Sequence, residues 1–290
     1  MAIIEPMKQQ LLLKPSIFLL VCIILTGLAS CAGEQQVESD TSIGGKPNFN
    51  GIWQAMNSAN WNLEAHPAQA LDAFWPLGAI AAIPAGSSVV MGGSIPYLPE
   101  ALTKRDANRA GWPAADPEAK CYMPGIPRAT YMPHPFQIVQ GEGDIILFSY
   151  AFANANRPVY MNEQQHQTAP VDLWMGWSNG SWDGDTLVIE VNSNIDQTWL
   201  DRAGNHHSIA MIVTERYTLV NENLIQYEAT IDDPQTFSRP WTISMPLYRH
   251  VEADARLLEH SCVAFAEQLL YGDLMSKDSA AVATPLTGEQ

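Results

Sequence analysis

Short segments of alternating apolar and polar residues fill the second half of the chain. Clusters of turn-forming residues separate them, at 141–143, 183–185, 221–223 and 232–234. An alternation with a period of two is typical of strands that bury one face. The pattern therefore predicts strands at residues 136–140, 144–150, 157–161, 186–192, 209–219, 224–231, 241–248 and 257–263. Such a succession favours an antiparallel meander that closes into a barrel or folds as a sandwich.

The first half of the chain predicts fewer regular elements. Residues 97–111 predict a helix, because Pro99 suits its first turn and Gly111 suits its end. Residues 66–91 are rich in Ala, Gly and Pro, so we expect a long covering loop there, with a short helix at 67–75. A second short helix is predicted at 263–274.

Five prolines interrupt the segment before the regular strands. They argue against both a helix and a central strand, so the segment predicts an extended stretch across the barrel. The prolines stand at positions 117, 124, 127, 133 and 135.

Two predicted strands alternate clearly enough to assign their faces. In the strand at 209–219, Glu215 shares the apolar face with Val213 and Tyr217. In the strand at 224–231, Tyr227 lies on the apolar face and Glu228 on the polar one. Glu215 is therefore an acid on a buried face, which requires either a partner or a function.

The first thirty residues are typical of a secretory signal. Lys8 and Lys14 precede a short apolar run that ends at 28–31 in Leu-Ala-Ser-Cys. This ending resembles a bacterial lipobox, which implies that Cys31 is the first mature residue and carries lipid. Ala32 stands where an aspartate would retain a lipoprotein at the inner membrane, so we expect anchoring to the outer membrane, with the body in the periplasm or at the cell surface. A plain signal peptide with an incidental cysteine is the alternative.

The remaining chain predicts a tether, one body and a tail. Residues 31–48 are polar and lack periodicity, which predicts a flexible tether. Residues 49–277 suffice for a single all-β domain, and residues 278–290 predict a disordered tail.

The charge balance excludes one class of partner. Loss of Lys8, Lys14 and Glu5 with the signal leaves 13 basic and 30 acidic residues, a formal charge of −17. Nucleic acids require a basic surface, so they are not expected partners.

The cysteines predict one disulfide. Cys22 lies in the signal and Cys31 at its end, which leaves Cys121 and Cys262. An even pair in an oxidising compartment indicates a bridge, here from Cys121 to the final predicted strand. Two buried thiols are the alternative.

Three blocks of the sequence are similar to a family of bacterial secreted proteins and lipoproteins whose activity is not established. They read DPEAKCYMPGIPR, GSWDGDTLVIEV and TWLDRAGNHHS, and the similarity extends over residues 93–263. The resemblance implies a mainly β, antiparallel, lipocalin-like barrel with a few short helices and long N-terminal covering loops. The Gly-x-Trp triplet at 51–53 agrees with the first strand of such barrels. In the last block, His207 matches the family's second histidine and Asn205 replaces the first.

The block at 198–208 carries the candidate chemistry. An unpaired buried carboxylate has a raised pKa, which suits a general acid or base. Glu215 would be the base, His207 the acid, and Asp201 would orient His207 in an isomerisation, dehydration or cyclisation. Alternatively, Glu215 forms a structural ion pair with Arg128 or Arg202.

A barrel of this size can instead enclose one small molecule. We expect such a pocket to be lined by Tyr217, Trp199, Arg202, Arg128 and Tyr227. The sequence contains no H-x-H or H-E-x-x-H spacing, and we expect neither a metal nor a cofactor. The favoured hypothesis is a lipoprotein that binds a small apolar or aromatic molecule. An enzyme on the same barrel and a structural or assembly lipoprotein are the alternatives.

Overall fold

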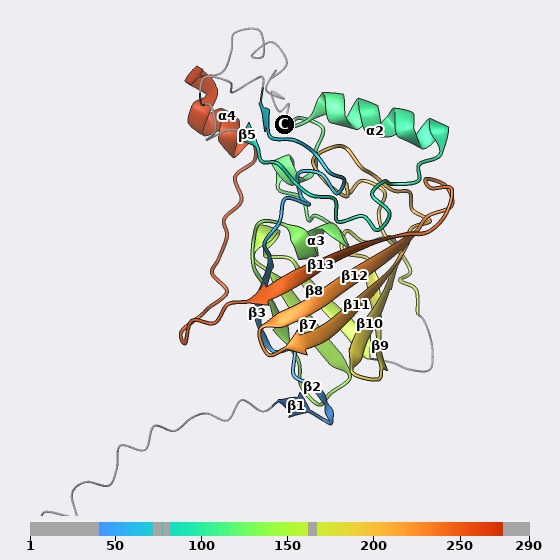
Figure 1. The fold of residues 1–290 in the computed structure, drawn as a ribbon, viewed down its shortest axis with the longest axis vertical. Helices are drawn as coiled ribbons and strands as arrows, with labels where there is room; N and C mark the ends of the chain where they lie inside the picture. The colour runs from blue at the N-terminus through green and yellow to red at the C-terminus, as the bar shows by residue number, and fades with distance from the viewer. Residues whose placement is uncertain (1–40, 72–76, 78–81, 162–166, 275–290) are drawn as a thin grey trace, which may run out of the picture. The chain divides into compact units, whose positions relative to one another are not determined.

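A closed barrel of strands forms the body of the protein in a computed structural model (Figure 1), which describes residues 41–71, 77, 82–161 and 167–274. Around the barrel the order is β10-β11-β12-β13-β3-β6-β7-β8-β9, and β9 pairs with β10 to close it. Neighbouring strands are antiparallel except β8 and β9, which are parallel. The predicted mainly β barrel is confirmed, although its pairing is mixed. The strands are β3 (Gly51–Ala55), β6 (Phe136–Val139), β7 (Ile145–Tyr150), β8 (Asn156–Met161), β9 (Trp177–Asp183), β10 (Thr186–Asn192), β11 (Ile212–Asn221), β12 (Leu224–Asp232) and β13 (Trp241–Arg249).

Seven of these strands, β6, β7, β8 and β10 to β13, lie on segments where the sequence predicts them. The alternating pattern does not predict β9, because Asn179 and Gly180 interrupt its apolar positions. The strand predicted at residues 257–263 is wrong, since that segment has no regular structure and Leu258 is 73 % exposed. Because β13 already pairs with β3, the closed barrel offers no free edge to a further strand.

Aromatic side chains fill the barrel interior. The rings of Phe148 and Tyr217 lie 5.4 Å apart, and those of Tyr217 and Tyr227 lie 4.9 Å apart. Phe136 packs against Tyr150 at 5.4 Å, and all five residues are buried. The predicted apolar faces of β11 and β12 are confirmed, because they point into this core.

Helices and loops cover one end of the barrel, which we call the covered end (Figure 1). Helix α2 (Pro99–Gly111) confirms the prediction and lies there with α3 (Arg128–Tyr131) and the small hairpin of β4 (Gln69–Ala70) and β5 (Ala82–Ile83). The expected helix at 67–75 is thus wrong at 69–70, and residues 72–75 lie outside the described residues. A second hairpin, β1 (Ser42–Ile43) with β2 (Lys46–Pro47), lies at the opposite end.

The proline-rich segment forms short helices, contrary to the prediction. Pro117 immediately precedes the 3-10 helix η2 (Glu118–Lys120), and Pro127 immediately precedes α3. Proline is compatible with a helix start, where its missing N–H costs no hydrogen bond, so the prolines delimit these helices instead of preventing them. A further 3-10 helix, η3 (Phe152–Asn154), follows β7.

The predicted disulfide is confirmed. Cys121 and Cys262 are bonded across a sequence separation of 141 residues. Cys262 lies in the irregular segment after β13 instead of in a final strand. The chain continues into α4 (Ala266–Tyr271) and the 3-10 helix η4 (Gly272–Leu274), which confirms the short helix predicted there.

Several predictions fall wholly or partly outside the described residues. The signal, Cys31, residues 31–40 of the tether and the tail at 278–290 are not described. Residues 42–47 of the expected tether form the β1–β2 hairpin and are therefore regular. None of the helices in the described ranges is long and apolar enough to cross a membrane.

Candidate functional site

Glu215 forms a buried ion pair inside the barrel. Arg157 on β8 donates from Nη2 to Glu215 Oε2 at 2.5 Å, and both side chains are almost completely buried. Glu215 Oε1 accepts hydrogen bonds from the hydroxyls of Tyr217 at 2.9 Å and Tyr227 at 2.7 Å. The carboxylate is therefore neutralised and hydrogen-bonded on both oxygens.

The tyrosines beside Glu215 are held in their neutral, donating form. Burial raises the pKa of Tyr217 and of Tyr227, and the negative charge of Glu215 raises both further. Because Tyr217 donates to Glu215, the 3.4 Å contact between its hydroxyl and Thr130 Oγ1 has Thr130 as donor. Tyr217 and Tyr227, expected to bind a ligand, instead serve this internal network.

Arg157, and not Arg128 or Arg202, is the partner of Glu215. Both of the predicted arginines bind other acids: Arg128 donates from two nitrogens to Asp116 at 2.9 and 3.0 Å and also to Glu118. Arg202 donates to Glu118 at 2.9 and 2.7 Å. The idea of a structural acid–arginine pair is thus confirmed for Glu215, but the predicted partners are wrong.

Both ring nitrogens of His207 have hydrogen-bond partners, in an arrangement that suits a neutral ring. Its Nδ1 lies 2.9 Å from the carbonyl of Ser208, so Nδ1 carries the proton and donates. Its Nε2 then accepts from Thr198 Oγ1 at 2.6 Å. Burial lowers the pKa of His207, which favours this neutral form. The structure describes no hydrogen bond between His207 and either Asp201 or Glu215, so it does not bring the predicted relay together.

Asp201 organises the turn at 201–205 instead of orienting His207. Its carboxylate accepts backbone N–H groups of Leu63 at 2.9 Å, Ala203 at 2.9 Å and Asn205 at 3.2 Å. Burial raises the pKa of Asp201 to about 6, although these hydrogen bonds oppose the shift. The neighbouring Arg202 donates its backbone N–H to the carbonyl of Asn60 at 2.9 Å, so this turn is bound to the loop that carries Trp61.

The turn places Arg202 beside a pair of tryptophans. Its guanidinium carbon lies 4.4 Å from the ring centre of Trp61 and 6.0 Å from that of Trp112, and the two rings lie 5.8 Å apart. Glu118 fixes the guanidinium in this position through two hydrogen bonds. Burial raises the pKa of Glu118, but Arg128 and Arg202 outweigh this effect and lower the pKa to about 2.

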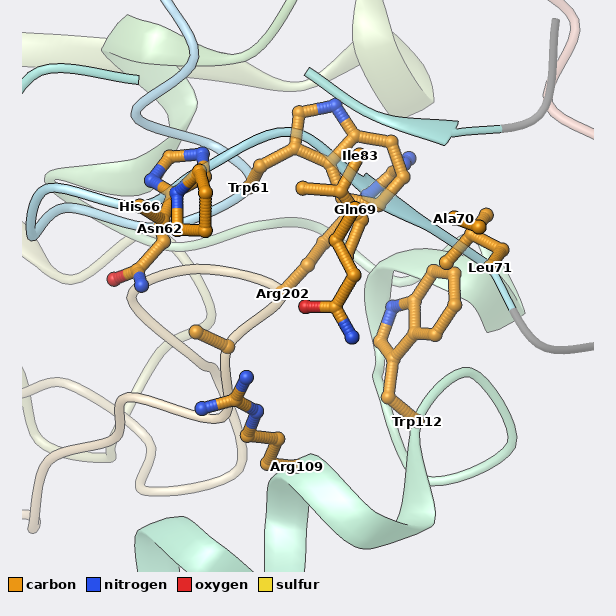
Figure 2. A pocket seen from close by; sticks show the side chains of 12 residues that line it. Trp61, Asn62, His66, Gln69, Ala70, Leu71, Ile83, Arg109, Trp112 and Arg202 are labelled. Atoms are coloured by element: carbon orange, nitrogen blue, oxygen red, sulfur yellow. The ribbon is translucent and has the colours of Figure 1, made fainter. Parts of the chain in front are cut away.

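A cavity of about 230 Å³ opens beside these rings at the covered end, and we call it the Trp61–Trp112 pocket (Figure 2). Leu71 and Ile83 contribute apolar surface, and Asn62, Gln69 and Arg109 contribute polar groups. The view shows Arg109 extending from the end of α2 towards the other lining residues. Apolar surface with a few convergent polar groups is the usual composition of a small-molecule site.

A glycine brings α2 and the turn at 201–205 together. Gly204 has a φ of +87°, and a Cβ there would lie 2.6 Å from the backbone nitrogen of Arg109. Asn108 donates to the Gly204 carbonyl at 3.2 Å. This close approach fixes Arg109 and Arg202 on neighbouring walls of the pocket.

Of the five residues predicted to bind a ligand, only Arg202 lines this pocket. Arg128 is buried in its ion pairs, and Trp199 is 7 % exposed beside the bridge that joins it to His206. No sequence pattern identifies Trp61, Trp112 or Arg109, because they lie in loops or at a helix end and belong to no motif. One sequence feature could have indicated Trp112, namely its position directly after the predicted helix.

Comparison with known proteins adds no assignment to this geometry. No family model matches the chain, and neither a curated protein nor a solved structure matches it significantly. In the described part of the chain, no group of three or more His, Cys, Asp or Glu side chains is arranged to hold a metal ion. A function for the pocket is therefore proposed from the residues that line it.

Proposed function

We propose that this barrel protein binds a small aromatic molecule in the Trp61–Trp112 pocket, and that a lipid on Cys31 holds it at the outer membrane. The observation that carries the binding proposal is the pair of tryptophan rings at 5.8 Å beside an open cavity. Aromatic rings supply a large apolar contact area at a small cost in conformational entropy, and ring pairs add about 0.5–1.5 kcal/mol beyond the buried area.

The dimensions of the pocket support a ligand of one or two rings. Its volume of about 230 Å³ exceeds the roughly 150 Å³ of an apolar cavity that takes up benzene. Asn62 and Gln69 can hydrogen-bond to a polar substituent on such a ring. The barrel interior is occupied by its own aromatic side chains, so the proposed ligand lies at the covered end and not among Tyr217 and Tyr227.

Removing either pocket tryptophan is expected to weaken binding of an aromatic ligand about tenfold, because each ring contributes a stacking surface. The full chain would be titrated with a library of single-ring compounds, and affinity would be measured by isothermal calorimetry for Trp61→Ala and Trp112→Ala. Trp177→Ala is the matched control, since Trp177 stacks on Tyr160 at 4.7 Å on the barrel wall and does not line the pocket.

The two variants also distinguish neighbouring cavities. Trp112 also lines a second cavity, of about 310 Å³, together with His134 and His260. Of these two cavities, Trp61 lines only the Trp61–Trp112 pocket. A loss of affinity in both variants supports the proposal. A loss in Trp112→Ala alone would move the ligand to the second cavity, and equal affinities in all three variants would contradict a tryptophan-lined site.

The membrane anchor has a separate test. Cys31→Ser is expected to release the protein from the membrane fraction, because the acylated side chain would be lost. Lipid attachment is measured by the mass of the N-terminal peptide, and release by fractionation of cells. Membrane association that persists in the variant would contradict the lipid anchor.

A further inference from the structure

Two arginines line the Trp61–Trp112 pocket of an otherwise acidic protein. The chain has 15 Lys and Arg against 31 Asp and Glu. The described residues that line the pocket nevertheless include Arg109 and Arg202 and no acidic side chain. The two arginines differ in whether an acidic residue of the protein compensates their charge.

Arg202 is largely neutralised by the protein itself. Its Nε and Nη2 donate to the two oxygens of Glu118, and its guanidinium lies against Trp61. A bidentate pair of this kind is compensated in charge and fixed in direction. Arg202 therefore forms part of the pocket wall, and Glu118 compensates most of its charge.

Arg109 differs from Arg202 in this respect. Its guanidinium makes no hydrogen bond or ion pair with any described residue. Arg105, one turn earlier on α2, donates from Nε and Nη2 to Asp106 at 3.0 and 2.7 Å and is therefore paired. The C-terminal end of a helix favours a cation, but that effect does not explain why the side chain lines a pocket. A planar guanidinium matches a carboxylate through two parallel hydrogen bonds.

We infer that the ligand is an aromatic carboxylate, whose ring lies beside Trp61 and Trp112 and whose carboxylate is bound by Arg109. The inference rests on the proposed function and adds the charge of the ligand to it. Because Arg109 is exposed at the rim of the pocket, the ion pair stays in contact with water and contributes moderately.

Two probes of matched shape test this inference. The full chain would be titrated with 4-nitrobenzoate and with 4-nitrobenzamide, which differ in charge and share the nitrophenyl ring. Quenching of tryptophan fluorescence and calorimetry would give both affinities. The carboxylate is expected to bind about fivefold more tightly than the amide. Arg109→Gln is expected to bring the two affinities close to equality, whereas Arg105→Gln should keep the fivefold ratio.

The outcomes separate this inference from the proposed function. Equal affinities for the two probes, both weakened by Trp61→Ala, would overturn the charge inference and leave aromatic binding standing. Binding that Trp61→Ala does not change would overturn the proposed function as well. If neither probe binds, the carboxylate provides no affinity and the inference fails. A preference for the carboxylate that persists in Arg109→Gln would exclude Arg109 as its partner.

Discussion

Replacing Arg157 with methionine is expected to lower the free energy of unfolding by about 3–5 kcal/mol. The substitution leaves the Glu215 carboxylate buried inside the barrel without its counter-charge. The hydroxyls of Tyr217 and Tyr227 would still donate to it, but neither supplies a positive charge. A buried charge whose partner is removed costs much more than an ion pair contributes, which is why a large loss is expected.

Urea denaturation followed by circular dichroism measures this loss. Arg216→Met is the matched control, because Arg216 pairs with Asp183 at 2.7 Å on the outside of the barrel. The two side chains are 40 % and 68 % exposed, so this pair should contribute less than about 1 kcal/mol. Similar losses in the two variants would contradict a buried ion pair at Glu215.

A double variant separates charge from packing. Glu215→Gln keeps a side-chain oxygen that can accept from Tyr217 and Tyr227 but removes the negative charge. In the background of Arg157→Met it should therefore recover part of the lost stability. A double variant as unstable as the sum of the two single ones would show that the pair acts through packing and not through charge.

The sequence was sufficient to identify Glu215 as a buried acid but not to identify its partner. The alternation in β11 determines the face of Glu215 from local residues alone. Arg157 and Val159 alternate in the same way on β8 and are both buried, so the inward direction of Arg157 was also available from the pattern. β8 and β11 face each other only because the barrel closes, and this closure includes the parallel β8–β9 pair. A local sequence pattern does not predict such a long-range arrangement.

For the block TWLDRAGNHHS too, the sequence predicts the segment but not its contacts. Its residue types predicted a candidate site, but their roles depend on which groups they meet in space. Asp201 accepts N–H groups of its own turn and of Leu63, whereas His207 binds Thr198. The pocket combines positions 61, 112 and 202, which are far apart in the chain and lie in segments without periodicity. Their meeting depends on the packing of the turn against α2 at Gly204, which cannot be read from spacing.

Acidification is expected to remove on the order of 3 kcal/mol of stability through Glu118. Burial raises the pKa of this carboxyl, but Arg128 and Arg202 outweigh burial and lower it from 4.5 to about 2. A group whose pKa is lower in the folded state stabilises the fold fully above its unfolded pKa. The contribution of Glu118 should therefore be present above about pH 4.5 and be lost as the pH falls towards 2.

The comparison of the unchanged chain with Glu118→Gln isolates this contribution. Free energies of unfolding from urea titrations at pH 6 to pH 2.5 should differ most at the upper end and converge at the lower end. Asp201 acts in the opposite direction, because its pKa is raised to about 6 and its protonation favours the folded state as the pH falls below that value. It is present in both proteins, so it cancels in the difference. A difference that stays constant over this range would mean that the two arginines do not hold Glu118 in its charged form.

Protonation of Glu118 should also affect ligand binding in the Trp61–Trp112 pocket. Glu118 holds Arg202 against Trp61, so a neutral Glu118 releases the guanidinium from its bidentate pair. Affinity for an aromatic ligand should therefore fall over the pH range in which the stability difference disappears, and Glu118→Gln should bind weakly at every pH. Loss of stability without loss of affinity would separate the ion-pair network from the pocket and leave Arg202 positioned by its tryptophan contacts alone.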